Sequence, residues 1–398
     1  MPRSVRPVFF RPLLALALIV PLTVGAQTLD TAASSALVVD YETGAVLLEK
    51  NADEPIPPAS MSKLMTLNML FEAIQEGRVS LEDTFPVSEN AHGYGGSTMF
   101  LETRHNPTVE DLIRGIVVLS GNDACIVVAE QLAGSERAFA DRMTARAREL
   151  GMNDSTFINS TGWPHPEHRM SARDLVTVGR RMIDEFGEFY HYWAETEFTW
   201  NDITQRNRNP LLYSDVGGDG LKTGHTEEAG YGLVGSAVRD GRRVLFMVTG
   251  LDSISARTTE SERIVSWAFR EFENVTFFEE GDVVAEADVW LGEQASVPLV
   301  AGDSIVATLP IGQAANATAR VIYDGPIPAP VRAGDHVADL VLDTGTVGEI
   351  TIPLVAGIEV LEGGAMTRVL SSGRLLAERA LEQIAGGGEE TAAETATE

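Results

Sequence analysis

Cysteine and lysine are two residue types that this sequence nearly lacks. Cys125 is the single cysteine of the 398 residues, so no disulfide can form within the chain, and cysteine content does not indicate a redox compartment. Lysine occurs only as Lys50, Lys63 and Lys222, although arginine is common. Each lysine is therefore a candidate functional group.

Positive charge as a whole is also scarce. The formal net charge is −28 at pH 7. A chain of this charge repels nucleic acid and anionic lipid, which excludes the nucleic-acid-binding classes. The simplest interpretation of the acidic balance is solubility, and it says little about the substrate.

Long hydrophobic runs are missing after the N-terminus, so no internal transmembrane helix is predicted. Residues 1–26 are typical of a signal peptide: three arginines, then the short apolar run Leu13–Val20, then the small residues Val24-Gly25-Ala26. We expect an exported protein of the periplasm or cell envelope, with association with the inner membrane left open. A buried N-terminal helix or strand is the alternative.

Cap and turn signals divide the remaining chain into two domains. Thr108 with Asp111, and Ser171 with Asp174, resemble capping boxes at helix starts. After Phe278, short β-rich runs alternate with Gly-Asp and Asp-Gly turns. Helices are predicted at 60–76, 135–150, 171–186 and 259–272, and strands at 36–39, 45–49, 231–238 and 243–249. The predicted segments are a first domain at 27–274, a β-rich domain at 275–368, a helix at 369–386 and a disordered acidic tail at 387–398.

The stretch Ser60-Met61-Ser62-Lys63 is the first candidate for chemistry. Positions i and i+3 share a helix face, so Lys63 can reach the Ser60 hydroxyl. A serine hydroxyl needs a base to become a nucleophile, and a lysine is that base only when burial or a second cation lowers its pKa. Alone, this spacing is also compatible with a helix cap and a solvated lysine.

Two further motifs follow it along the chain. Ser120-Gly121-Asn122 offers a second hydroxyl for proton transfer and an amide for a substrate carbonyl, or else a plain helix cap. Lys222-Thr223-Gly224 lies before the predicted hairpin strands at 231–249 and offers a fixed cation, a hydroxyl for a carboxylate and a close backbone approach, or else a turn. The serines of the first two motifs are 60 residues apart, and Lys222 lies 162 residues after Ser60.

In this order the three motifs resemble those of penicillin-binding proteins and serine β-lactamases. Over nearly the whole mature chain, the sequence is similar to the low-molecular-weight penicillin-binding proteins, serine-type D-alanyl-D-alanine carboxypeptidases. The stretches that carry the resemblance are Pro58–Thr66, Gly96–Leu101, Ile113–Gly115, Ser120–Ala124, Asn207–Asn209, Asp219–Thr226 and Trp267–Arg270. It implies an α+β fold: a DD-peptidase domain with an antiparallel sheet flanked by helices, then a small all-β sandwich.

The resemblance implies a role for each motif. Ser60 would attack the penultimate D-alanine carbonyl of peptidoglycan pentapeptides, Lys63 would take its proton, and Ser120 with both lysines would protonate the departing D-alanine. The backbone N–H groups of Ser60 and His225 would form the oxyanion hole.

Substrate binding is implied for a further group of side chains, and penicillin would acylate the same serine. The implied substrate-binding residues are Asn122, Lys222, Thr223, Gly224, His225, Arg208 and Arg257. The partners implied are peptidoglycan stem peptides and β-lactam antibiotics, and no cofactor or metal is expected.

The chain departs from this family pattern at two places. The loop after Leu101 usually turns on glycine, whereas here it is Glu102–Pro107. Many relatives end in a partly basic amphipathic helix, whereas Arg374 and Arg379 here face glutamates and an acidic tail. This favours weak or no direct membrane anchoring.

Other functions compete with carboxypeptidase action. A DD-endopeptidase and a β-lactamase share the motifs, although Glu167–Ser171 lacks the pattern of a β-lactamase deacylation loop. A non-catalytic peptidoglycan-binding scaffold is disfavoured by the intact motifs. His165 and His168 suggest a metal only weakly, because the context is proline-rich and no third ligand is apparent. Cys125 is interpreted as a small core residue.

Overall fold

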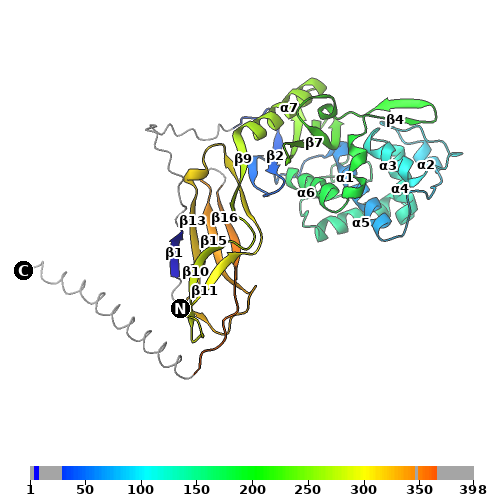
Figure 1. Cartoon of the computed structure of the whole chain (residues 1–398). Coiled ribbons are helices and arrows are strands. Elements are labelled where there is room, and N and C mark those ends of the chain that lie inside the picture. The colour runs from blue at the N-terminus through cyan, green and yellow to red at the C-terminus, as the bar shows by residue number, and fades with distance from the viewer. Residues whose placement is uncertain (1–3, 9–28, 346–347, 365–398) are drawn as a thin grey trace, which may run out of the picture. The chain divides into compact units, whose positions relative to one another are not determined.

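The computed structural model describes residues 4–8, 29–345 and 348–364 (Figure 1). These residues form two compact units that divide between Phe272 and Glu273. The predicted helix at 369–386 and tail at 387–398 lie outside the described residues. So does most of the predicted signal peptide, of which Ser4–Val8 forms strand β1.

The first unit contains a five-stranded antiparallel sheet in the order β3-β2-β8-β7-β6. The strands are β2 (Ser35–Asp40), β3 (Val46–Lys50), β6 (Gly218–Thr226), β7 (Gly230–Arg239) and β8 (Arg242–Leu251). The predicted hairpin of the first two strands is confirmed, as is the turn at Asp240-Gly241. Strand β6 lies at one edge of the sheet.

Seven helices are described in this unit. They are α1 (Lys63–Gln75), α2 (Glu89–His92), α3 (Val109–Val117), α4 (Asn122–Ala133), α5 (Glu136–Glu149), α6 (Ala172–Asp184) and α7 (Ile254–Glu271). Helix α6 packs on β2, β7 and β8, and α7 packs on β7 and β8 from the opposite face (Figure 1). A small hairpin of β4 (Glu197–Trp200) and β5 (Ile203–Arg206), which the sequence did not suggest, completes the unit.

The start of α1 differs from the prediction. Residues Ala59–Ser62 form a 3-10 turn, and the α-helix itself begins at Lys63. The capping box of Thr108 and Asp111 is confirmed, with both hydrogen bonds present. At α6 the Ser171 hydroxyl caps the helix, but the Asp174 carboxylate accepts from the Ser155 hydroxyl instead of completing a box.

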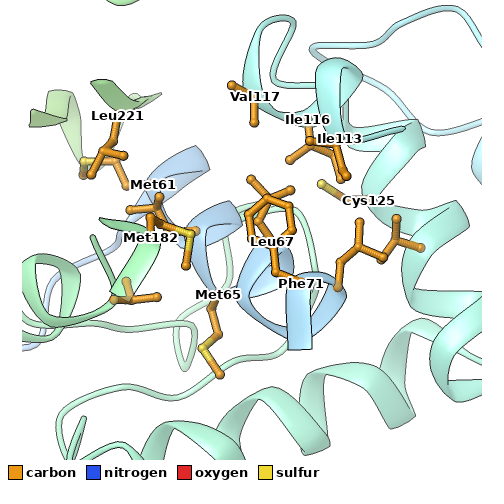
Figure 2. Packing of buried hydrophobic residues seen from close by; sticks show 14 of the residues in the cluster. Met61, Met65, Leu67, Phe71, Ile113, Ile116, Val117, Cys125, Met182 and Leu221 are labelled. Carbon is orange, nitrogen blue, oxygen red and sulfur yellow. The ribbon is translucent and has the colours of Figure 1, made fainter. Parts of the chain in front are cut away.

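The core of this unit lies between the sheet and the helices around α1. Figure 2 shows Leu67 of α1 facing Ile113 and Ile116 of α3, whereas Met65 extends from the other side of α1; all of them, with Phe71, belong to one buried cluster. Cys125 of α4 is buried in the same cluster, as predicted for a small core residue.

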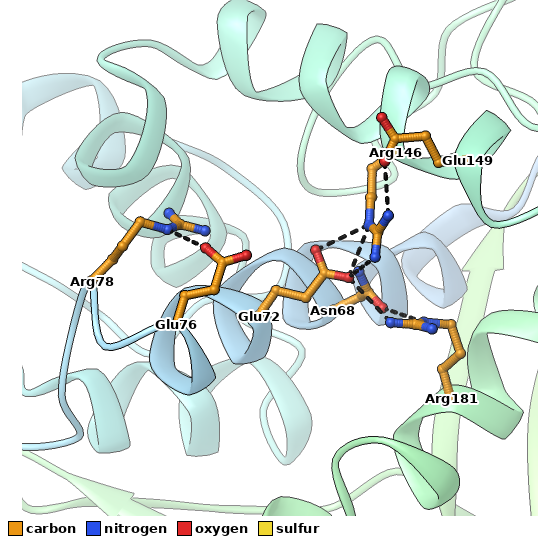
Figure 3. Close-up of polar contacts among 7 residues, drawn as sticks. All are labelled: Asn68, Glu72, Glu76, Arg78, Arg146, Glu149 and Arg181. Atoms are coloured by element: carbon orange, nitrogen blue, oxygen red, sulfur yellow. Dashed lines mark hydrogen bonds and ion pairs between the residues drawn. The ribbon is translucent and has the colours of Figure 1, made fainter.

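A charged contact joins α1 to α5 and α6 at the edge of this core. The Glu72 carboxylate accepts from Arg146 Nη2 at 2.9 Å and from Arg181 Nη2 at 3.1 Å, and Arg181 Nε also donates to Asn68 Oδ1 at 3.0 Å (Figure 3). One carboxylate therefore holds arginines from two helices.

The second unit is all-β in its described residues apart from one 3-10 turn. A seven-stranded sheet has the order β1-β13-β15-β16-β11-β10-β14, and β9 pairs with β12. The strands are β9 (Phe272–Phe278), β10 (Val283–Trp290), β11 (Ser296–Ala301), β12 (Ile305–Pro310), β13 (Thr318–Tyr323), β14 (Ile327–Pro328), β15 (His336–Asp343) and β16 (Glu349–Ala356). Alternating side chains enclose a separate core, and the predicted α+β fold class is confirmed.

None of the helices among the described residues combines the length and the apolar character that a membrane crossing requires.

Candidate active site

Ser60 lies in the 3-10 turn that leads into α1, where it is half-buried. Lys63 is fully buried at the first position of α1, and its Nζ donates to Ser60 Oγ at 2.9 Å. The contact predicted from the three-residue spacing is therefore present, although the turn is 3-10 rather than α-helical.

Two more acceptors hold the Lys63 ammonium group. Its Nζ donates to Asn122 Oδ1 at 2.8 Å and to the backbone carbonyl of Thr161. Burial lowers the pKa of Lys63 to about 8, because desolvation disfavours the charged form. The nearby guanidinium of Arg208 lowers that pKa further, and nearby anionic groups oppose the shift. The lysine can thus lose its proton near neutral pH.

Ser120 and Asn122 lie at the start of α4, where Ser120 is buried with a positive φ of 60°. The Asn122 carboxamide donates through Nδ2 to the Gly95 carbonyl at 2.8 Å while its oxygen accepts from Lys63. The side chain is held at both ends, so the second motif fixes the lysine of the first. The Ser120 hydroxyl instead contacts Lys222 of the third motif.

Lys222 projects from the edge strand β6, and its Nζ donates to Ser120 Oγ at 2.9 Å. Lys222 precedes the predicted hairpin strands, as expected, but it lies inside a further strand at the sheet edge that the glycine-rich sequence did not indicate. Lys222 is buried, and desolvation together with the neighbouring Lys63 lowers its pKa well below the ordinary lysine value. Each lysine therefore contacts one serine hydroxyl.

These groups meet beside a cavity of about 450 Å³. The residues that line it are Ser60, Ser97, Ser120, Arg208, Thr223, Gly224, His225, Tyr231, Ile254 and Arg257. The cavity brings together side chains from the 3-10 turn, the α4 region, β6, β7 and α7. It contains the hydroxyl of the first motif, the hydroxyl of the second and the strand edge of the third.

Two arginines give the cavity its positive wall. Arg208 Nη1 donates to Ser97 Oγ at 2.5 Å, and Arg257 Nη2 donates to the Arg208 carbonyl at 3.1 Å. Arg257 Nε is buried without a hydrogen-bond partner among the described residues. Burial, with a contribution from Arg208, lowers the pKa of Arg257 to about 10. A carboxylate placed here would satisfy the unused donor and relieve the repulsion between the guanidinium groups.

Gly224 and His225 line the same cavity from β6. A Cβ on Gly224 would lie 3.0 Å from Met61 Cγ and 3.1 Å from the Pro58 carbonyl oxygen. The glycine thus lets the strand pack against the serine turn, an additional reason for its place in the motif. The exposed His225 ring stacks on Tyr231 with 3.8 Å between ring centroids.

All ten site residues predicted from the sequence therefore lie in or beside one cavity. Four others were not predicted as site residues: Ser97, Thr161, Tyr231 and Ile254. Ser97 stands in a stretch that carries the family resemblance, which was a usable signal. Thr161 gave none, because it contributes a backbone carbonyl that any residue could supply.

The unusual Glu102–Pro107 loop has a local explanation. His105 Nδ1 accepts from the Glu102 N–H at 3.0 Å, and the His105 N–H returns a bond to the Glu102 carbonyl at 2.8 Å. The histidine ring also packs edge-on against Trp200. A histidine cap thus closes this turn.

The two histidines that weakly suggested a metal have other surroundings. His168 is buried against Phe157, and its Nδ1 accepts from the Ile158 N–H at 3.2 Å. Burial lowers the pKa of His168 to about 4, so the ring is neutral. The described ranges contain no group of three or more His, Cys, Asp or Glu side chains arranged to hold a metal ion.

Comparison with known proteins places this geometry in a family. Residues 22–253 match the Peptidase_S11 family, described as D-alanyl-D-alanine carboxypeptidase, and residues 272–362 match the C-terminal domain of penicillin-binding protein 5. D-alanyl-D-alanine carboxypeptidase DacC of Escherichia coli (strain K12) is 36% identical over 355 residues, which cover 87% of this chain and 88% of that protein.

Solved structures agree with this match. Penicillin-binding protein 5 from Haemophilus influenzae has a TM-score of 0.78 and 32% identity, covering 85% of this chain and 100% of that one. Penicillin-binding protein D2 from Listeria monocytogenes in its ampicillin-bound form has a TM-score of 0.56 and 29% identity, covering 61% of this chain and 98% of that one. The chain belongs to the serine-type D-alanyl-D-alanine carboxypeptidases of the low-molecular-weight penicillin-binding protein family.

Proposed function

We propose that this carboxypeptidase removes the terminal D-alanine of peptidoglycan pentapeptides through an acyl-enzyme on Ser60. The single observation that carries the proposal is the 2.9 Å contact between Lys63 Nζ and Ser60 Oγ inside a buried site. A neutral Lys63 takes the hydroxyl proton as Ser60 Oγ attacks the penultimate carbonyl carbon. The pKa of about 8 makes the neutral form accessible near neutral pH.

Departure of D-alanine requires a proton on its nitrogen. Ser120 Oγ, which accepts from Lys222 Nζ at 2.9 Å, is the proposed donor, with Lys222 supporting the transfer and Lys63 returning the proton. The C–N bond breaks, the acyl group stays on Ser60 and free D-alanine leaves. Water then hydrolyses the ester with Lys63 as base, and Ser60 is restored.

Recognition of the substrate uses both walls of the cavity. The backbone N–H groups of Ser60 and His225 are proposed as the oxyanion hole, where each donor contributes a few kcal/mol to transition-state binding. Thr223, Arg208 and Arg257 are proposed to hold the terminal carboxylate. The buried Arg257 Nε, which has no hydrogen-bond partner among the described residues, and the presence of both guanidinium groups in the cavity wall support this proposal. Asn122 would bind the substrate amide through its carboxamide, and Gly224 leaves the edge of β6 accessible to the peptide.

β-Lactams are proposed to acylate the same serine, because their strained amide presents its carbonyl and carboxylate to the same groups. The ampicillin-bound relative supports this assignment. Bacterial cell-envelope relatives and the signal-peptide pattern of residues 1–26 support a periplasmic location.

The test is to incubate purified mature protein with a fluorescent penicillin and to measure D-alanine release from a pentapeptide ending in D-Ala-D-Ala. The Ser60→Ala variant is the control. A covalent label that requires Ser60, together with released D-alanine, is expected. Rapid penicillin turnover without peptide cleavage would replace the proposal with a β-lactamase, and labelling without D-alanine release would indicate an endopeptidase or scaffold.

A further inference from the structure

The carbonyl that Lys63 contacts belongs to a loop, residues 159–163, that forms neither helix nor strand. Within the loop, Asn159 Oδ1 accepts from the backbone N–H groups of Thr161 at 3.1 Å, Gly162 at 2.8 Å and Trp163 at 3.0 Å. One side chain thus sets the local curve of the loop. It does not place the loop relative to α1, which carries the lysine.

That placement comes from the residue before Thr161. Glu136 Oε1, at the first position of α5, accepts from the Ser160 N–H at 3.1 Å and from the Ser160 hydroxyl at 3.0 Å. On the other side, the Ser160 carbonyl accepts from Thr66 Oγ1 of α1 at 2.6 Å. Ser160 is fully buried. The residue is therefore held between α5 and α1, and the next carbonyl is directed at Lys63.

The surroundings of Glu136 give its carboxylate a second effect. The titratable groups that interact with it are Lys63 of α1, Glu130 and Cys125 of α4, and Tyr94 before α3. Burial raises the pKa of Glu136, whereas the Ser160 bonds and the lysine favour its anion. The N-terminus of α5 favours the anion as well. In turn, the negative charge of Glu136 raises the pKa of Lys63.

We propose that Glu136 is a positioning residue for the general base: it holds the Thr161 carbonyl against Lys63 through Ser160 and supplies a negative charge to the buried lysine. The inference rests on the function proposed above. None of the three motifs includes this glutamate, and it does not line the active-site cavity. Its action passes through two backbone positions of the loop.

Three substitutions separate the two effects. Glu136→Gln keeps an acceptor oxygen of the same reach but removes the charge. Glu136→Asp keeps the charge but shortens the side chain, so the bonds to Ser160 are lost. Glu136→Ala removes both, and Glu149→Gln, at the exposed far end of α5, is the matched control. For each, the experiment measures the second-order rate of penicillin acylation between pH 5 and 10, with the melting temperature.

The charge-removing and the shortening substitutions are expected to change different quantities: the first shifts the pH profile and the second lowers the maximal rate. The Glu136→Gln variant is acylated at nearly the maximal wild-type rate. The acid limb of its rate–pH profile, where the rate rises as Lys63 loses its proton, moves to lower pH by a few tenths of a unit, because removing an anion near Lys63 lowers the pKa of the lysine. The maximal acylation rate of Glu136→Asp is roughly tenfold lower because the base is misplaced, and the acid limb of its rate–pH profile does not move. Glu136→Ala shows both changes, and the control shows neither.

The proposal fails if Glu136→Ala, folded with an unchanged melting temperature, acylates with the wild-type rate and pH profile. It also fails if Gln and Asp lose the same rate with no movement of the limb, which is the pattern of a purely structural role. Wild-type labelling and its loss in Ser60→Ala are measured first. Absence of wild-type labelling would overturn the proposed function itself, a distinguishable outcome.

Discussion

The Asn122 carboxamide oxygen accepts from Lys63 Nζ at 2.8 Å, which joins the second sequence motif directly to the base of the first. A neutral acceptor holds the lysine without adding charge. Because burial lowers the pKa of Lys63 to about 8, the charge on that acceptor decides how much of the lysine is neutral.

Asn122→Asp is expected to slow acylation at pH 7 by about tenfold. The new carboxylate stabilises charged Lys63 and raises its pKa by about one unit or more. The acid limb of the acylation profile should therefore move up, opposite to the shift for Glu136→Gln. The pH dependence of penicillin acylation tests this, and an unmoved limb would contradict it.

The wild-type enzyme should acylate faster as the pH rises through the pKa of Lys63. The neutral lysine is the active form, so activity is lost as the pH falls below about 8. Lys63→Arg removes this dependence, because a guanidinium stays protonated over the whole range. The maximal acylation rate should then fall by about 10² to 10⁴. A variant retaining the wild-type rate would exclude Lys63 as base.

The parts of the site that the sequence predicted are those set by spacing within one element. Lys63 reaches Ser60 because three residues make nearly one turn of either helix type, so the prediction held although the turn is 3-10. The position of Lys222 could not be predicted in the same way. Its strand is rich in glycine and lacks a hydrophobic alternation, and only pairing with β7 makes it a strand.

The contribution of the loop before α6 was also beyond the sequence. Thr161 acts through its carbonyl, and Glu136 acts through contacts with a residue 24 positions away. Side-chain type indicates neither. The all-β character of the second unit, by contrast, followed from its turn spacing, because alternating strands that share one core repeat their turn residues.

Gly162→Ala should slow acylation by disturbing the turn that carries Ser60. Gly162 has a φ of +79°, and a Cβ there would lie 1.9 Å from the Ala59 carbonyl oxygen. Neither backbone can yield without moving the serine or the loop, and the left-handed conformation adds about 1–2 kcal/mol of strain. We expect a lower melting temperature and roughly tenfold slower penicillin labelling. Gly151→Ala is the control: its φ is +79° as well, but no atom lies within 4 Å of the added Cβ. Equal loss of labelling in both variants would contradict the steric argument.

Arg257→Ala should lower activity on peptides that end in a free carboxylate. The guanidinium lines the cavity and has a buried, unpartnered Nε, so it is placed to pair with that group. Loss of a charge-assisted bond costs about 2–3 kcal/mol of transition-state stabilisation, which lowers kcat/KM by roughly 30- to 150-fold. An amidated peptide is the comparison. The wild-type preference for the free acid should shrink in the variant, and an unchanged preference would remove Arg257 from carboxylate recognition.

Glu72→Ala should destabilise the first unit without slowing penicillin labelling of the folded enzyme. The Glu72 side chain is 15% exposed and holds both Arg146 and Arg181 (Figure 3). When it is removed, the partly buried Arg181 keeps only the neutral Asn68 and Arg146 keeps the exposed Glu149. The expected loss is about 2–3 kcal/mol in the free energy of unfolding, discounted from a fully buried pair for the remaining solvent. Glu76→Ala is the matched control. It removes the same side chain one turn later in the chain, but Glu76 is 58% exposed and, within the described part of the chain, forms its ion pair with the exposed Arg78, so about 1 kcal/mol or less is at stake. Urea unfolding is monitored by the loss of penicillin labelling, and the urea midpoints of the Glu72→Ala and Glu76→Ala variants are compared. Equal midpoints would mean that the arginines find other partners or water at no cost, and that burial does not strengthen this contact.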